Sequence, residues 1–116
     1  MKKIYNTIRK LGITSKYKGY YYLAEAIGMV MKQEEQQIRI TKDIYPCLSG
    51  KFKSTPSNVE RDIRTAINAC WKLNKKGMDE IAGHPLAYKP TNSEFIDMVA
   101  YYLSFSDEDT SKENAG

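Results

Sequence analysis

The sequence has few of the residues that enzymes and metalloproteins concentrate at their active sites. Two cysteines and one histidine occur among its 116 residues, and their spacing is not that of a four-ligand metal site. We expect Cys47 and Cys70 to be buried, reduced thiols. The alternative, a catalytic Cys–His pair, is disfavoured because neither cysteine lies in a recognisable nucleophile motif. His84 precedes Pro85 and is most simply a loop residue. With no Gly-rich phosphate loop or catalytic carboxylate pair, the sequence predicts a protein that is not an enzyme and needs no cofactor or metal.

Long hydrophobic runs are also missing. No apolar segment approaches the roughly 18 residues that a membrane span needs. The start of the chain, residues 1–5, is basic but lacks the apolar stretch of a secretory signal. We therefore expect a cytoplasmic protein that does not bind a membrane. The hydrophobic fraction of 41% and the charged fraction of 28% are ordinary for a globular protein with one core.

Charge is distributed unevenly along the chain. Residues 1–76 contain 16 Lys or Arg against 6 Asp or Glu, a balance of +10, whereas residues 77–116 contain 2 against 8, a balance of −6. A basic body suggests a polyanionic partner, although a solvated basic surface would give the same composition. Residues 106–116 have little apolar content, so we predict a helical domain over residues 1–105 followed by an acidic disordered tail.

Hydrophobic spacing predicts an all-α fold of about six helices, because no segment alternates as a strand would. Gly12 follows the first apolar-periodic segment as a C-terminal stop. Pro46 must lie in the first turn of its helix, where its missing N–H does no harm. We expect helices over residues 3–11, 20–31, 41–52 and 56–71, a short helical turn over 78–82, and a last helix from a Thr91–Glu94 capping box to Leu103.

The third and fourth predicted helices are joined by about three residues, which is the outline of a helix-turn-helix. Thr55 before Pro56 is a strong helix start, although Ser57 with Glu60 offers a capping box one turn later. At about 100° per residue, the fourth helix has an apolar stripe and an arginine stripe more than a right angle apart. The apolar stripe is Val59, Ile63, Ala66, Ile67 and Cys70, and the polar stripe is Ser57, Arg61, Arg64 and Asn68, with Glu60 between them.

The polar stripe carries residue types that recognise bases in the major groove. The planar guanidinium groups of Arg61 and Arg64 match the two acceptors on a guanine edge. Glu60 can accept from a cytosine amino group or orient Arg64 one turn later. Residues 56–71 are therefore predicted to be the recognition helix of a sequence-specific, double-stranded DNA-binding protein. We expect contacts with the DNA backbone, which set the register, from Lys51, Lys53, Ser57, Asn58 and Asn68.

Four motifs in a fixed order resemble one known family. They are KGYYYLAEAI at residues 18–27, ITK at 40–42 with YP at 45–46, VER, IR and AI within 59–67, and KPTNSEFI at 89–96. Together they resemble the C-terminal effector domain of the stage-zero sporulation response regulator, the master transcription factor of endospore-forming bacteria. The resemblance runs from about Ile4 to Leu103, which is nearly all of the predicted helical domain.

The resemblance implies an all-helical fold with an embedded helix-turn-helix, similar to the winged-helix superfold but without a clear wing. It also implies binding to a short DNA element, often present in tandem copies that adjacent subunits occupy as a homodimer. In the family, the Glu and two Arg of the VERxIR motif approach the bases, which corresponds here to Glu60, Arg61 and Arg64. A contact with RNA polymerase is a further implied partnership.

Three features depart from the family pattern. The phosphoacceptor receiver domain does not occur within these 116 residues, so we expect either an excised domain or a stand-alone protein that phosphorylation cannot switch by the usual route. Asn58 stands where the family commonly has arginine, and Thr65 where it often has histidine, which should weaken backbone affinity or alter the preferred element. Residues 71–89 are fewer than in the family segment implicated in contacting RNA polymerase.

A second hypothesis assigns the chain to a different class of protein. An effector domain without a receiver can act as a protein-interaction module that pairs with a full-length relative through its last helix and modulates it. Tyr101 and Tyr102, beside the apolar Val99 and Leu103, are the candidate contacts. The simpler interpretation, which we favour, is that the same tyrosines form the edge of the protein's own core.

Overall fold

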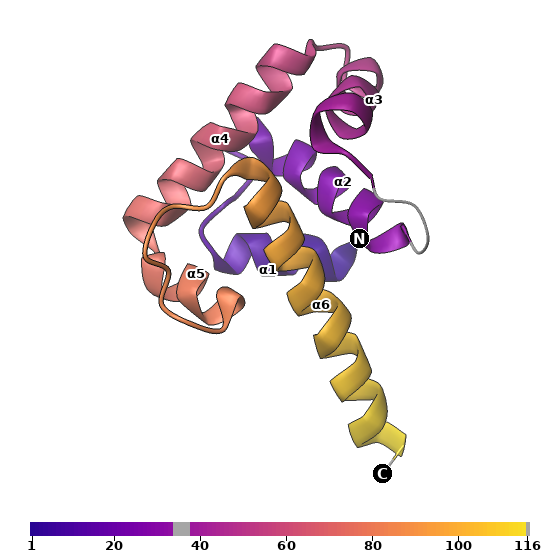
Figure 1. Ribbon diagram of the computed structural model, residues 1–116, viewed down its shortest axis with the longest axis vertical. Coiled ribbons are helices and arrows are strands. Elements are labelled where there is room, and N and C mark those ends of the chain that lie inside the picture. Colours follow the sequence, from indigo (N-terminus) through magenta and orange to yellow (C-terminus); the bar gives the residue numbers. More distant parts are fainter. Residues whose placement is uncertain (34–37, 116) are drawn as a thin grey trace.

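The computed structural model describes residues 1–33 and 38–115 of the chain, with side chains described up to residue 105. Within these ranges all regular structure is helical, which confirms the predicted all-α fold of about six helices (Figure 1). The elements are α1 (Lys2–Lys10), α2 (Gly19–Lys32), the π-helical turn η1 (Ile40–Ile44), α3 (Tyr45–Lys51), α4 (Pro56–Leu73), α5 (Lys75–Ala82) and α6 (Asn92–Ala115).

Helix α2 is the centre of the core, because it packs against α1, α4 and α6. Its residues Leu23 and Ile27 are completely buried. Gly19, at its first turn, lies against the backbone of α4. A Cβ atom at this position would lie 2.3 Å from the carbonyl oxygen of Asp62, far inside van der Waals contact. The absence of a side chain at Gly19 therefore sets how closely α2 and α4 approach.

The third helix differs from the single helix predicted over residues 41–52. The chain first makes a π-helical turn, in which the N–H groups of Ile44 and Tyr45 bond to carbonyls five residues earlier, and only then continues as α3. Pro46 lies in the first turn of α3, as predicted. Because its ring crowds the carbonyl of Lys42 and it has no N–H to donate, the turn before it opens to the wider spacing.

The break after α4 also lies elsewhere than predicted. Helix α4 extends to Leu73, past the predicted end at residue 71, and Asn74 interrupts the helical backbone. The side-chain oxygen of Asn74 accepts from the N–H of Gly77 at 3.1 Å and so caps a new helix, α5, which is longer than the predicted turn over 78–82. A polar residue before an apolar turn can either continue a helix or cap the next one, and Asn74 caps α5.

Helix α6 begins with the predicted capping box. The N–H of Thr91 donates to the Glu94 carboxylate at 2.9 Å, and the N–H of Glu94 donates to the Thr91 hydroxyl at 3.2 Å. The helix continues to Ala115 and projects beyond the other helices (Figure 1). Its backbone therefore passes residue 105, where we placed the end of the helical domain. The side chains of 106–115 lie outside the described part, and the acidic tail stays a prediction.

The two cysteines have different surroundings, and both are free thiols. Cys70 is buried on α4, as predicted, and burial raises the pKa of its thiol to about 11. Cys47 is exposed on α3, so the prediction that it is buried was wrong. The residues of this short helix that enter the core are Tyr45 and Leu48 instead.

Candidate nucleic-acid interface

The turn between α3 and α4 brings these two helices together at one corner of the molecule (Figure 1). The N–H of Ser54 bonds to the carbonyl of Ser49 at 2.8 Å, which closes the end of α3 in a Schellman arrangement. This arrangement needs a left-handed residue at Lys53, whose φ is 54°. Glycine is the usual residue at such a position, because a Cβ atom destabilises left-handed backbone. A lysine here exposes a cation at the tip of the turn.

The start of α4 is set by Thr55 and Pro56. The Thr55 hydroxyl accepts from the N–H of Asn58 at 3.1 Å, and Pro56 occupies the first helical turn. Of the two starts that the sequence left open, the structure has the one at Thr55. Ser57 is thereby placed inside the first turn as an exposed residue, rather than serving as the cap.

Helix α4 separates a buried face from an exposed one. The predicted apolar stripe is entirely buried: Val59, Ile63, Ala66, Ile67 and Cys70 are each at most 2% exposed. The side chains of Arg61 and Arg64 are 61% and 54% exposed. Because α3 packs against α4 on the buried side, the guanidinium groups lie on a surface that the rest of the described chain leaves open to solvent.

Both arginines make contacts within their own helix. Arg64 Nη1 lies 2.8 Å from Glu60 Oε1, and Arg61 Nη2 donates to the Asn58 side-chain oxygen at 3.0 Å. Arg61 Nε also lies 4.0 Å from Asp62. Exposed pairs at this helical spacing contribute only about 0.3–0.5 kcal/mol. They orient the side chains without preventing a stronger bidentate contact, and of the two roles considered for Glu60 the free protein uses the orienting one.

The remaining predicted site residues differ in how exposed they are and in whether their side chains already have a partner within the protein. Lys53 and Ser57 are exposed near the tip of the turn. Lys51, at the end of α3, is paired with α2: its Nζ lies 2.9 Å from the carboxylate of Glu25. Asn68 is partly buried, and its side-chain oxygen has no hydrogen-bond partner in the described structure. Lys53 and Ser57 therefore have the clearest approach to a phosphate, whereas Lys51 and Asn68 would have to rearrange.

A groove of about 390 Å³ runs beside the arginine face of α4, between that helix and the segment before α6. One wall carries Glu60, Arg64 and Asn68, and the other carries residues 89–93. The side-chain amide of Asn92 crosses this region to bond with α3 and α4. The spacing of residues in the sequence does not connect residues 89–93 with α4. The KPTNSEFI motif contains these residues and is the one sequence feature that marks the segment.

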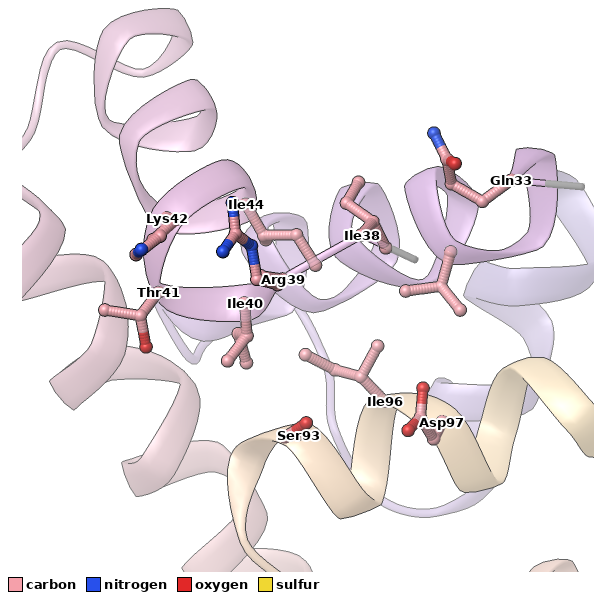
Figure 2. A pocket seen from close by; sticks show the side chains of 11 residues that line it. Gln33, Ile38, Arg39, Ile40, Thr41, Lys42, Ile44, Ser93, Ile96 and Asp97 are labelled. Atoms are coloured by element: carbon pink, nitrogen blue, oxygen red, sulfur yellow. The ribbon is translucent and has the colours of Figure 1, made fainter. Parts of the chain in front are cut away.

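A second hollow, of about 550 Å³, lies between the end of α2, η1 and the start of α6 (Figure 2). Ile38, Ile40 and Ile96 give it an apolar floor, and Arg39 and Asp97 lie at its rim. The carboxylate of Asp43 accepts from the backbone N–H of Arg39 at 2.8 Å. The same carboxylate lies 3.9 Å from the Arg39 Nε. Within the described ranges no three metal-ligating side chains gather.

The last helix exposes aromatic side chains. Tyr101 is 66% exposed and Tyr102 is 38% exposed, while Val99 before them and Leu103 after them are buried in the core. The ring of Tyr101 packs against that of Phe105 with centroids 4.6 Å apart. The tyrosines therefore lie outside the core edge, on the surface of α6. Across the described residues, no helix is both long and apolar enough to cross a membrane.

These features define an all-helical domain in which a helix-turn-helix, α3 to α4, turns a basic face outward. Comparison with protein families agrees: residues 4–103 match the model of the family described as sporulation initiation factor Spo0A, C terminal. The chain belongs to this family of DNA-binding effector domains. The match covers the four motifs that carry the resemblance, and the family is one of transcription factor domains rather than enzymes.

Proposed function

We propose that this protein is a transcription regulator that binds double-stranded DNA sequence-specifically, with α4 in the major groove. Glu60, Arg61 and Arg64 contact base edges in this proposal, and Lys53, Ser57 and Asn58 contact phosphates. The observation that carries it is the pair of exposed guanidinium groups on α4, opposite a stripe that is buried against the rest of the domain. A helix supported in this way can enter the groove without losing core contacts.

Arginine and lysine are assigned different tasks because of their chemistry. A guanidinium fork can bond to both acceptors of one guanine, and each such contact contributes about 1–3 kcal/mol of discrimination between bases. A lysine at the tip of the turn attracts any phosphate and adds affinity without sequence preference. Lys51 and Asn68 stay in the proposed interface as backbone contacts, which requires Lys51 to exchange Glu25 for a phosphate.

The decisive experiment selects bound duplexes from a random pool and then measures affinities by fluorescence anisotropy. We predict that Arg61→Ala and Arg64→Ala each lower the preference for the selected duplex over a scrambled one by about 5- to 150-fold, the equivalent of 1–3 kcal/mol. The helical circular dichroism should not change, because both side chains are exposed. Equal weakening on both duplexes would instead make these arginines phosphate contacts.

Lys53→Ala serves as the matched control from the same corner of the molecule. It should weaken binding to both duplexes by one common factor and reduce the slope of log affinity against log salt by about 1. A change in sequence preference on this substitution would contradict the division of tasks between arginine and lysine.

The proposal extends to partners and place of action. Adjacent copies occupy tandem DNA elements as a homodimer, and a contact with RNA polymerase links binding to transcription. A regulator of this kind acts in the cytoplasm, where bacterial DNA lies. The support for these statements is family membership alone. Sedimentation on duplexes with one and with two copies of the selected element tests the tandem arrangement.

A further inference from the structure

Asn92, the first residue of α6, connects the last helix with both helices of the helix-turn-helix. Its side-chain nitrogen donates to the Tyr45 hydroxyl on α3 at 2.9 Å and to the backbone carbonyl of Glu60 on α4 at 3.1 Å. These bonds join residues 47 and 32 positions apart. By contrast, the side-chain bonds of Arg61 and Arg64 stay within α4. One amide group therefore spans three elements at the level of the base-contacting residues.

The neighbours of Asn92 hold it in place. The reciprocal bonds of Thr91 and Glu94 fix the first turn of α6, and Phe95 and Ile96 bury the next turn in the core. Tyr45 is 7% exposed, and burial raises the pKa of its hydroxyl, so the group stays neutral. A planar amide has two N–H donors at a fixed angle, which suits one acceptor on each of two helices.

We propose that Asn92 is a positioning residue for sequence recognition. By holding the Glu60 carbonyl and the Tyr45 hydroxyl at once, its amide fixes the angle between α3 and the part of α4 that carries Glu60 and Arg61. This inference rests on the proposed function. In a helix-turn-helix, α3 lies across the DNA backbone while α4 enters the groove, so their angle determines where the guanidinium groups meet the bases.

Base contacts and phosphate contacts differ in their tolerance of a small rotation. Bidentate hydrogen bonds from arginine to guanine require the correct orientation of the guanidinium plane as well as the correct distance. A lysine acts on a phosphate as a point charge, which depends little on orientation. Loss of the Asn92 amide should therefore reduce discrimination between sequences more than it reduces general affinity. A residue that only stabilises the fold would not produce this difference at a temperature where the protein stays folded.

The test uses the whole chain with Asn92→Ala, Tyr45→Phe and the double variant, on the selected and scrambled duplexes described above. We expect Asn92→Ala to lower the ratio of the two affinities about tenfold, with the scrambled-duplex affinity and the salt slope unchanged. Tyr45→Phe should have a smaller effect, because it removes one of the two acceptors. The double variant should match Asn92→Ala, since both changes break one connected network.

Val99→Ala is the control for stability, because Val99 is fully buried and lies on the same helix about two turns after Asn92. This substitution should lower the melting temperature. When binding is measured below the melting temperature, the ratio of the affinities for the selected and scrambled duplexes should equal that of the unmodified protein. The inference is overturned if Asn92→Ala leaves the ratio unchanged, weakens both duplexes equally, or changes the ratio no more than Val99→Ala does. If the unmodified protein itself does not discriminate between duplexes, the proposed function fails and this role fails with it.

Discussion

Lys53 places a cation on the surface at a position where its backbone conformation is unfavourable for the fold. Among the described residues other than glycine, it alone has a positive φ. For an L-residue, left-handed backbone costs roughly 1–2 kcal/mol. The Schellman closure of α3 requires this conformation, and glycine would adopt it without strain. The lysine side chain gives the turn a cation that glycine could not supply, at the place where α4 begins.

A substitution at Lys53 should therefore separate stability from binding. We predict that Lys53→Gly raises the free energy of unfolding by about 1 kcal/mol and weakens binding to every duplex, because strain and charge are removed together. Lys53→Ala should weaken binding to the same degree without the gain in stability. Urea unfolding combined with anisotropy measures both quantities. If Lys53→Gly proves less stable than Lys53→Ala, the left-handed conformation is not the source of strain.

At the scale of elements, α4 depends on a close approach to α2 that apolar periodicity does not predict. Its backbone at Asp62 and Ile63 lies directly against Gly19, on the side opposite the arginine face. A displacement of α4 at this point would carry Arg61 and Arg64 with it, because an α-helix moves as a rigid unit. The KGY run in the sequence therefore contributes to the geometry of a surface more than 40 residues later in the chain.

Gly19→Ala should be strongly disruptive. The added Cβ would lie 2.3 Å from a backbone carbonyl oxygen that cannot move alone, so we predict a loss of about 1–3 kcal/mol in unfolding free energy. Gly28→Ala is the matched control on the same helix. There the nearest atom is the Met1 sulfur at 3.3 Å, at the end of a flexible side chain. Thermal unfolding should separate the two variants, and equal melting temperatures would contradict the steric argument.

At the scale of the whole molecule, basic and acidic residues are concentrated in different parts of the chain. Helix α4 and the turn before it belong to the basic part, residues 1–76, and α6 carries the acidic C-terminal residues away from that corner (Figure 1). Residues 106–116 contain four acidic residues and one lysine, a balance of −3, so the rest of the chain has a balance of +7 against a total of +4. General attraction to DNA should respond to this total.

A truncation after Phe105 tests both the charge argument and the predicted domain boundary. We expect the shortened protein to bind a scrambled duplex more tightly at low salt, because repulsion from the acidic residues is removed. The advantage should vanish at high salt, and the melting temperature should not change. A clear fall in melting temperature would show that residues 106–116 belong to the folded domain.

The sequence by itself determined the fold class, the helix-turn-helix and the two faces of α4. These features depend on local preferences, namely apolar periodicity, the Thr55–Pro56 start and the Thr91–Glu94 box, which act within one or two turns. Only the tertiary structure decided that Cys47 is exposed while Cys70 is buried. Contacts between distant segments, such as Gly19 against Asp62 and Asn92 across Tyr45 and Glu60, depend on how the helices pack, which local periodicity does not encode.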